Sequence, residues 1–493
     1  MKKNLMTRVS ALMLTVIMLI AVGVACAEQT PSGSDETTVG GSETQTPSAD
    51  ELSNLPLKNF NGLTVTVMTR RHDSVPQFDS YEVATESDTN ALDDAINRRN
   101  DYVEETYGIT LNEIKEANPG QKTSIMALSN DDTVDYVVSQ MTDLRAFVSS
   151  GALYDLNNST YFEYDKPWWH EEINETYSIA NKLFMTMNDY LLMYKQQSYC
   201  IFFNKTMADN LQLDNLYDTV DAGDWTWDLM YQYMQLASED LDGDTQMTPA
   251  DQYGYVTQYG GLLSSVVCSD VHFSYKDEND IPVIDGNNMK HSNVLGKLYD
   301  IYVDKENTIL ANDYTDASGN VDWGLPENIF NAERALFMNS VVRISKEIVS
   351  VSEVDYGIIP LPKISDEQDE YATFSELYNS TVFAIPVTAD FDTISYLLEA
   401  FSVASYDIVV PAYYEVTLKS RYAPDDRAKI MLDIIFSNYR IDTLLSYNWM
   451  DIYGFYDLIL INKTNTYESY YAGALDAAHA TVNKLLEEVG KLE

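Results

Sequence analysis

The segment DYVVSQMTDLRAFVSSGALYDL, residues 135–156, shows most clearly how this chain folds. Its first residues are largely apolar and predict a buried strand over 135–139. Residues 144–150 follow as a short helix that ends at Gly151, so Ser139 to Asp143 form the turn between strand and helix. In α/β sheets ligands bind at the carboxyl ends of strands, and this turn is therefore a candidate ligand loop.

The segments on either side alternate between strand patterns and helix patterns. Period-2 alternation and short apolar runs predict strands over 63–69, 109–114, 201–203 and 383–385. Apolar residues at three- and four-residue spacing predict helices over 91–107, 395–403, 425–438 and 474–492. Strands that alternate with helices indicate an α/β layer fold with mostly parallel strand pairing.

The charge balance excludes some partners. The 493 residues include 77 Asp and Glu against 31 Lys and Arg, which gives a formal net charge of −46. Phosphate backbones and anionic lipid surfaces repel such a chain, so we expect no nucleic-acid partner. Hydrophobic residues make up 45% of the chain, enough for most of it to bury a core.

The first 25 residues have the pattern of an export signal. Lys2, Lys3 and Arg8 form a positive start, and residues 11–25 form an apolar run that is short for a membrane span and right for a secretory signal. The chain is therefore expected to leave the cytoplasm.

Two interpretations of Cys26 follow from its surroundings. Ala25-Cys26-Ala27 fits a signal-peptidase site, which gives a secreted or periplasmic protein. Gly23-Val-Ala-Cys26 resembles a bacterial lipobox, in which Cys26 becomes the lipidated first residue. We favour lipidation at the outer face of the cell membrane, because residues 26–57 are a polar segment that suits a flexible tether.

Several motifs further along the chain occur in a recognisable order. They are the strand, loop and helix of residues 135–156, IFFNK at 201–205, WTWD at 225–228, FNAERALFM at 330–338 and YGIIPLPK at 356–363. Together they resemble the extracellular solute-binding proteins of ABC importers, family 1, the oligosaccharide-binding type that includes the maltose-binding protein. The resemblance covers residues 58 to about 490.

This resemblance implies a two-lobed α/β fold of the periplasmic-binding-protein type II, with a hinged cleft between the lobes. Lobe one is expected over 58–198 and 380–425, and lobe two over 199–379 and 426–493. The implied function is a receptor, not an enzyme, that captures a sugar or oligosaccharide in the cleft and delivers it to an ABC permease. We expect a monomer with no cofactor.

The resemblance also points to ligand-binding residues. A sugar needs aromatic rings for its faces and paired polar groups for its hydroxyls. The positions that match the family's cleft segments are Thr142, Asp143, Gln197, Tyr199, Tyr259, Asn339, Arg343, Tyr378, Asn379 and Trp449. Asp143 could also cap the helix that begins at Leu144. Trp168 and Trp169 could stack on a sugar or anchor the start of a helix.

A separate acidic loop, DLDGDTQMTPAD at 240–251, has the spacing of a calcium loop. Asp240, Asp242 and Asp244 occupy ligand positions 1, 3 and 5, Gln246 offers a backbone carbonyl at position 7, and Asp251 stands at position 12. The segment predicts a structural Ca²⁺ site, and its alternative is an acidic surface turn.

Other functions remain open in the sequence. The ligand could be a peptide or another polar solute. A secreted glycoside hydrolase is the main alternative from another class, although the many acidic residues supply candidate carboxylate pairs without pointing to one. Cys200 and Cys268 could pair as a disulfide or remain separate buried thiols.

Overall fold

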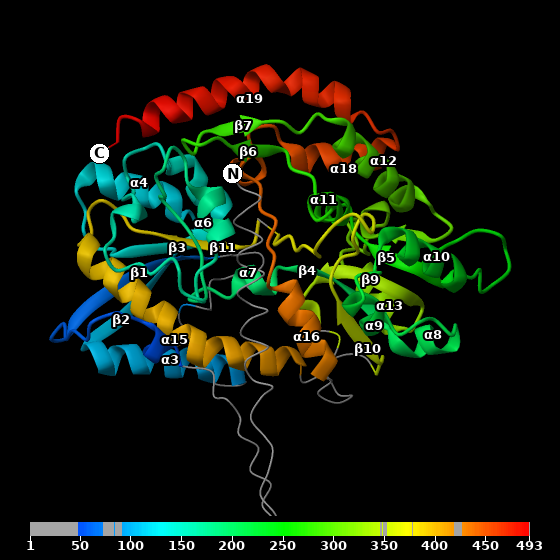
Figure 1. Cartoon of the computed structure of the whole chain (residues 1–493), viewed down its shortest axis with the longest axis horizontal. Helices are drawn as coiled ribbons and strands as arrows, with labels where there is room; N and C mark the ends of the chain where they lie inside the picture. The colour runs from blue at the N-terminus through cyan, green and yellow to red at the C-terminus, as the bar shows by residue number, and fades with distance from the viewer. Residues whose placement is uncertain are drawn as a thin grey trace, which may run out of the picture. The chain divides into compact units, whose positions relative to one another are not determined.

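Two β-sheets organise the part of the chain that the structure describes (Figure 1). The computed structural model describes residues 48–71, 83, 91–345, 348, 353–376, 378–418 and 426–492, and residues 47–493 form one compact unit. The first sheet has the order β11-β3-β1-β2, from β1 (Leu63–Arg70), β2 (Ile109–Glu116), β3 (Tyr136–Gln140) and β11 (Thr381–Ala384).

The second sheet has five strands in the order β10-β4-β9-β5-β8. Its strands are β4 (Tyr199–Asn204), β5 (Tyr253–Thr257), β8 (Thr308–Leu310), β9 (Ala335–Val341) and β10 (Tyr356–Ile359). A separate hairpin pairs β6 (Ser274–Lys276) with β7 (Pro282–Ile284).

Strand pairing is mixed, and the expectation of mostly parallel pairing was too simple. The pairs β1–β2, β1–β3, β5–β8 and β5–β9 are parallel. The pairs β11–β3, β4–β9 and β10–β4 are antiparallel. Each of these three antiparallel pairs contains a strand next to a segment that crosses between the two sheets. None of the three pairs therefore comes from a local strand–helix–strand unit.

Two long helices cover the first sheet. α15 (Phe391–Leu418) packs against α3 (Ala91–Tyr107), and Figure 1 shows them side by side. The sequence predicted α3 correctly but only 395–403 of α15, which begins at Phe391 and continues through Pro411. Residues 391–415 are long and apolar enough to cross a membrane, but 72% of that apolar stretch is buried, which is typical of a core helix.

The segment just before the first strand is folded, although it lies in the tether expected over 26–57. α2 (Ala49–Leu52) packs on α15. Ala49 is fully buried, and its N–H donates to both carboxylate oxygens of Asp407, at 3.0 and 2.8 Å. The hydroxyl of Tyr396 donates to the carbonyl of Pro56 at 2.5 Å.

The remaining helices lie between the strands or follow the last strand, and they pack on both sheets. They are α4 (Pro119–Ser129), α5 (Met141–Leu144), α6 (Glu171–Tyr177), α7 (Met193–Gln196), α8 (Lys205–Asn210), α9 (Leu216–Asp221), α10 (Trp227–Ala237), α11 (Gly260–Val267), α12 (Met289–Val303), α13 (Leu325–Asn331), α16 (Asp426–Ile435), α17 (Thr443–Tyr447), α18 (Ile452–Asn462) and α19 (Tyr467–Val489). Single 3₁₀ turns lie at Arg145–Phe147, Leu156–Asn158 and Ala311–Asp313.

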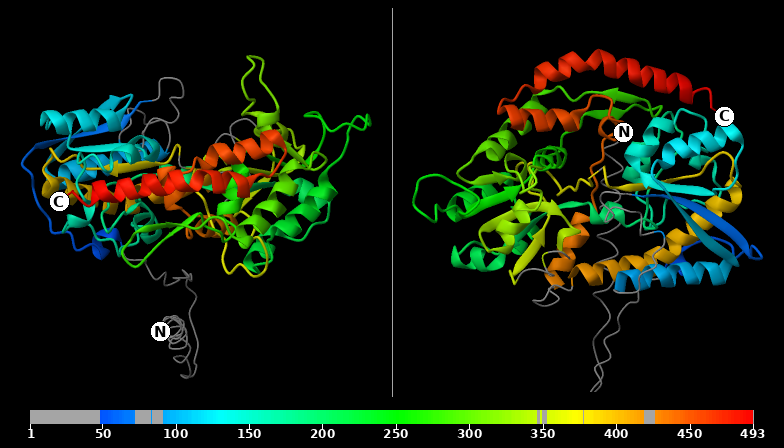
Figure 2. Two further views of the ribbon diagram at one scale, coloured as in Figure 1. Left: turned by 90° about the horizontal axis from the view of Figure 1, so that it is seen from above. Right: turned by 180° about the vertical axis from the view of Figure 1, so that it is seen from behind.

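The C-terminal helix is longer than the sequence indicated. The pattern predicted 474–492, but α19 begins at Tyr467 and includes Gly473 (Figure 2). Its first turns are fixed by tyrosines: Tyr467 donates to the carbonyl of Gly286 at 2.9 Å, and the hydroxyl of Tyr471 accepts from the N–H of Gly286 at 2.7 Å. Beyond its far end, the carbonyl of Leu492 accepts from Lys182.

Candidate functional site

Three chain segments cross between the two sheets and lie side by side. The crossing segments are 197–199, 373–376 and 438–440. Tyr199 donates its N–H to Phe374 O at 3.0 Å, and Glu376 donates its N–H to Gln197 O at 2.9 Å. Thr373 joins the third segment by two backbone hydrogen bonds. Its N–H donates to the carbonyl of Asn438 at 2.8 Å, and its carbonyl accepts from the N–H of Arg440 at 2.7 Å. The sheets are therefore joined by a small hydrogen-bonded strip.

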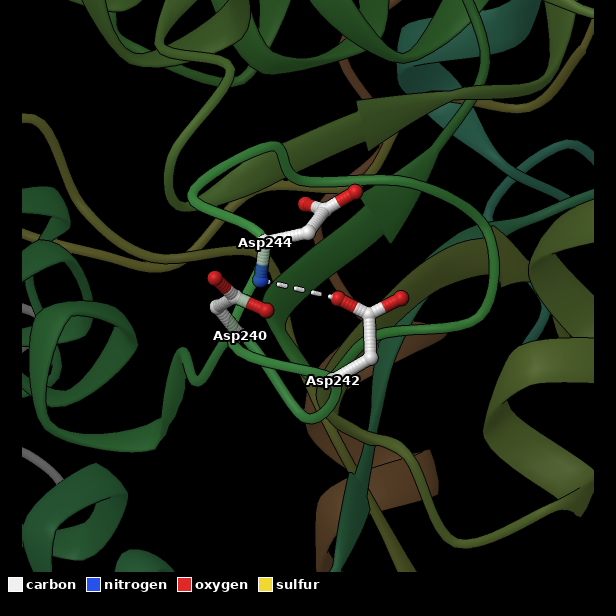
Figure 3. A group of neighbouring side chains, drawn as sticks. All are labelled: Asp240, Asp242 and Asp244. Atoms are coloured by element: carbon white, nitrogen blue, oxygen red, sulfur yellow. Dashed lines mark hydrogen bonds between the residues drawn. The ribbon is translucent and has the colours of Figure 1, made fainter.

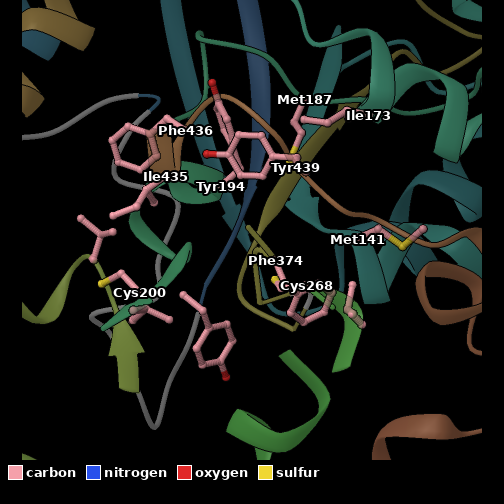
Figure 4. Close-up of a cluster of buried hydrophobic side chains, with 14 of the residues drawn as sticks. Met141, Ile173, Met187, Tyr194, Cys200, Cys268, Phe374, Ile435, Phe436 and Tyr439 are labelled. Carbon is pink, nitrogen blue, oxygen red and sulfur yellow. The ribbon is translucent and has the colours of Figure 1, made fainter. Parts of the chain in front are cut away.

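The core beside this strip is aromatic. Figure 4 shows Tyr194, Tyr439, Phe374 and Phe436 gathered near the crossing segments. Cys200 and Cys268 also lie in this region, and both are free buried thiols, so the open question of a disulfide is answered against pairing.

Tyr199 and Tyr259 lie at the same end of the strands of the second sheet. Tyr259 follows the carboxyl end of β5. Its hydroxyl donates to Asp313 at 2.6 Å, and its N–H donates to the side-chain oxygen of Asn312 at 2.8 Å. Tyr199 begins β4 and its ring stacks on Phe374 at 6.3 Å. Both tyrosines are almost fully buried, at 3% and 6% exposure.

Asn339 and Arg343 lie at the end of β9 and just beyond it. Asn339 is 2% exposed, and neither atom of its amide has a hydrogen bond of good geometry among the described residues, although the hydroxyl of Tyr255 is close enough to interact with it. A buried amide without well-formed hydrogen bonds is costly, so Asn339 has hydrogen-bonding capacity to spare for a bound molecule. Arg343 is half-buried, and its N–H donates to the carbonyl of Gln196 at 3.0 Å, which ties this turn to α7.

The first sheet places Thr142 and Asp143 on α5, directly after β3. The helix begins at Met141, earlier than the predicted 144, so Asp143 lies within the first turn and makes no cap. One carboxylate oxygen of Asp143 pairs with Arg70 and the other accepts from Ser139 at 2.6 Å. Asp143 therefore fixes the candidate ligand loop to β1 and β3.

The segment before β11 carries Tyr378 and Asn379. The carboxylate of Glu376 accepts from the N–H groups of Tyr378 and Asn379 and from the amide of Asn379, each at 2.9 Å. Burial raises the pKa of Glu376 to about 7. Tyr378 is 45% exposed and its ring packs edge-on against Tyr453 at 5.0 Å, so it presents an accessible aromatic face.

Gln197 and Trp449 are placed differently. Gln197 is buried and its amide contacts the sulfur of Met193 at 3.6 Å. Trp449 is 9% exposed and stacks on Tyr447 at 5.5 Å with an interplanar angle of 16°. Neither side chain is open to a ligand in this conformation.

Charged residues that the sequence did not single out join these positions. Burial raises the pKa values of Tyr199, Tyr259 and Tyr378, and the charge of Asp457 adds to the rise for all three. Burial and then Asp451 raise the pKa of Asp457 itself to about 6. The negative charge of Asp457, on α18, therefore acts on all three predicted tyrosines.

Arg145 connects the first sheet to this group. Its guanidinium donates to Ser446 O at 3.0 Å. Burial lowers the pKa of Arg145, and the nearby Tyr378, Tyr453, Asp451 and Asp143 oppose that shift. We call Tyr199, Tyr259, Tyr378, Arg145, Asp451 and Asp457 the junction site, because each charged member acts on at least one of the three tyrosines.

Trp168 and Trp169 are core anchors. Their ring nitrogens donate to the two carboxylate oxygens of Glu399, at 2.6 and 3.0 Å, and the rings are at most 5% exposed. This arrangement leaves no ring face for a ligand.

The acidic loop after α10 brings three carboxylates together (Figure 3). One oxygen each of Asp240, Asp242 and Asp244 lies within 4.8 Å of the others, which is the span of two ligands about 2.4 Å from one Ca²⁺. Thr245 stands where a calcium loop usually has Gly, and it adopts the left-handed φ of +72° that this turn requires.

The other two predicted ligands of this loop are placed less directly. Asp251 is 1% exposed and its carboxylate accepts from the N–H of Leu241 at 3.0 Å and the N–H of Thr248 at 2.7 Å, so it stabilises the loop from inside. Gln246 donates its N–H to Asp244 at 2.7 Å. Cys26, the predicted lipidation site, lies outside the described residues.

Comparison with known proteins bears on the fold. No protein-family model and no curated protein sequence matches the chain. Among solved structures, the chain is similar to a cyclic α-maltosyl-1,6-maltose binding protein from Arthrobacter globiformis, with 15% identity, a TM-score of 0.56, and 86% of this chain and 99% of that one covered.

Two further similar structures have comparable coverage. A cyclo/maltodextrin-binding protein complexed with maltotetraose matches at 10% identity and a TM-score of 0.55, over 89% of this chain and 99% of that one. An ABC substrate-binding protein from Listeria monocytogenes in complex with cycloalternan matches at 12% identity and 0.53, over 86% and 99%. These likenesses confirm the two-lobed α/β fold of solute-binding proteins.

Proposed function

We propose that this protein is an extracellular substrate-binding receptor that captures a sugar or oligosaccharide at the junction site and delivers it to the permease of an ABC importer. The proposal rests chiefly on Tyr378. Its half-exposed ring follows the crossing segment 373–376 and lies within electrostatic range of Arg145, of Asp451 and of Asp457 on α18.

This combination suits a sugar. An aromatic face packs on the apolar side of a pyranose ring, and carboxylate and guanidinium groups accept from and donate to its hydroxyls. The similar structures named above are themselves described as binding proteins for maltose-type oligosaccharides and cycloalternan, which supports the same ligand class here.

A calorimetric titration tests the role of Tyr378. We expect Tyr378→Ala to weaken binding of the preferred sugar by about tenfold or more, because the stacking face is lost. Tyr275→Ala is the matched control, since Tyr275 is equally exposed, at 48%, but lies on the β6–β7 hairpin. Equal affinities for the two variants would contradict the site.

One observation favours a second function, a secreted glycoside hydrolase. Asp457 has a pKa raised to about 6 and lies near Asp451, as a general acid beside a second carboxylate would. Chromatography of the sugar after incubation decides between the two functions. The receptor returns it intact, whereas a hydrolase releases shorter products that Asp457→Asn abolishes.

We also propose that the loop 240–251 holds a structural Ca²⁺, with Asp240, Asp242 and Asp244 as carboxylate ligands. The spacing of their oxygens supports this proposal. The backbone carbonyl of Gln246 would complete the set, while Asp251 would act by supporting the loop.

The remaining parts of the proposal concern the cell surface. We propose that the protein is exported, anchored by lipid at Cys26 and active as a monomer. Replacing Cys26 by Ala tests the anchor: a lipoprotein moves from the membrane fraction to the soluble fraction, and an unchanged distribution contradicts lipidation.

A further inference from the structure

Tyr194, on α7, touches all three crossing segments. Its carbonyl accepts from Ser198 Oγ on the first segment and from Ser375 Oγ on the second, both at 2.9 Å. The ring of Tyr439, on the third segment, lies 5.4 Å from the ring of Tyr194, and its hydroxyl is 3.1 Å from Ser198 Oγ. Figure 4 shows Tyr194 and Tyr439 together at this place.

The hydroxyl of Tyr194 is held by a buried charge cluster of Asp189, Lys195 and His170. The Lys195 ammonium lies 2.9 Å from the carboxylate of Asp189, and these side chains are only 5% and 3% exposed. Tyr194 donates its single proton to Asp189, so Lys195 and the Nε2–H of His170 must both donate to the Tyr194 oxygen. The hydroxyl and the carbonyl of Tyr194 are thus both fully engaged.

Such a cluster is expensive to bury. Burial opposes the charge of Asp189, but Lys195 and His170 outweigh it and hold the pKa of Asp189 well below its usual range. Apolar side chains of the same volume would stabilise a core at least as well, whereas a charged network accepts one arrangement of its neighbours. The cluster therefore fixes a geometry rather than adding stability.

We propose that Tyr194, held by Asp189, Lys195 and His170, is the fixed point of the hinge and positions the three crossing segments on which the junction site is built. The alignment of these segments sets the positions of Gln197, Tyr199 and Glu376, whose backbone groups join the first two segments. The inference rests on the proposed function in one respect: the hinge would let the two lobes move when a ligand is captured.

Hydrogen–deuterium exchange of the purified protein without ligand tests this role. Tyr194→Phe removes the hydroxyl that binds the charge cluster, and we expect about tenfold faster exchange of the amides that join the segments, such as those of Tyr199, Thr373 and Glu376. The amides within β1 and β9 should keep their rates.

Tyr190→Phe is the matched control. It also removes a buried hydroxyl, the one 2.7 Å from that of Tyr136, but within the first-sheet core. It should leave exchange in the crossing segments unchanged. Ser375→Ala provides a second variant, since it removes one bond to the Tyr194 carbonyl and should loosen the same amides.

Two results would overturn the inference. One is unchanged exchange of the crossing segments in both Tyr194→Phe and Ser375→Ala. The other is faster exchange spread equally over both sheets, which would mean general destabilisation. Because no ligand is present, failure of sugar binding would not affect either outcome.

Discussion

Replacing Glu399 by Gln should make stability depend on pH in a different way from the natural chain. Glu399 is fully buried on α15, and burial raises its pKa from 4.5 to about 8, although both indole N–H groups of Trp168 and Trp169 bind its carboxylate. The folded state therefore favours the protonated, uncharged form of Glu399. Its stabilisation is complete below pH 4.5 and is lost as the pH rises through 8.

The expected magnitudes can be set against each other. Each pKa unit is worth about 1.4 kcal/mol, so the rise from 4.5 to about 8 corresponds to at most about 5 kcal/mol of lost stability at high pH. The Gln variant does not ionise. Its amide has only one oxygen, so one of the two indole N–H groups is left without an acceptor, which costs about 1–3 kcal/mol at every pH.

The variant should thus be less stable than the natural protein at pH 4.5 and more stable at pH 9, with the order reversing between about pH 5 and 7. Glu376 and Asp457 also have raised pKa values, but they titrate in both proteins and cancel in the difference.

Urea unfolding followed by tryptophan fluorescence measures this difference at each pH. Glu171→Gln, at an exposed position on α6, is the control and should change neither stability nor its pH dependence. A difference between Glu399→Gln and the natural protein that stays constant from pH 4.5 to 9 would refute the reasoning.

Three further predictions concern single positions. Ca²⁺ should raise the melting temperature and a chelator reverse the rise, while Asp242→Asn should respond weakly; a melt that ignores both additions contradicts the loop site. Gly254→Ala should cost roughly 2 kcal/mol or more in urea unfolding, because its Cβ would meet backbone atoms of Met234 at 2.4 Å, whereas Gly296→Ala on α12 meets nothing and should be neutral or stabilising. Asp442→Asn should cost about 2–4 kcal/mol. One buried oxygen accepts the N–H groups of Phe273 and Ser274 and the other accepts that of Leu444, so the amide nitrogen would face an N–H group whichever way it turned; a loss below 0.5 kcal/mol argues against it.

The sequence predicted the local elements of the first sheet well. Residues 91–107 form α3 with the predicted bounds, and the strands at 63–69, 109–114 and 135–139 differ by a few residues at most. These patterns depend on which side chains face a core, and that periodicity is present in the chain itself. Antiparallel pairing at β4, β10 and β11 depends on how distant segments return, which no local pattern contains.

The candidate site was predictable in part for the same reason. Tyr199, Tyr259 and Tyr378 were singled out from motifs, and the structure brings them within range of Asp457. Arg145 and Asp457 were missed because each is an ordinary charged residue on a helix. Only the packing of α18 near the crossing segments joins them to the tyrosines.

The central claim is capture of a sugar without turnover. The most direct measurement is a thermal-shift titration of the purified protein with maltotetraose, cycloalternan and a short peptide, followed by chromatography of the ligand. We predict a rise in melting temperature that grows with sugar concentration, as for a ligand that binds only the folded chain, and recovery of the sugar intact. A response to the peptide alone, or release of shorter sugars, would contradict the account.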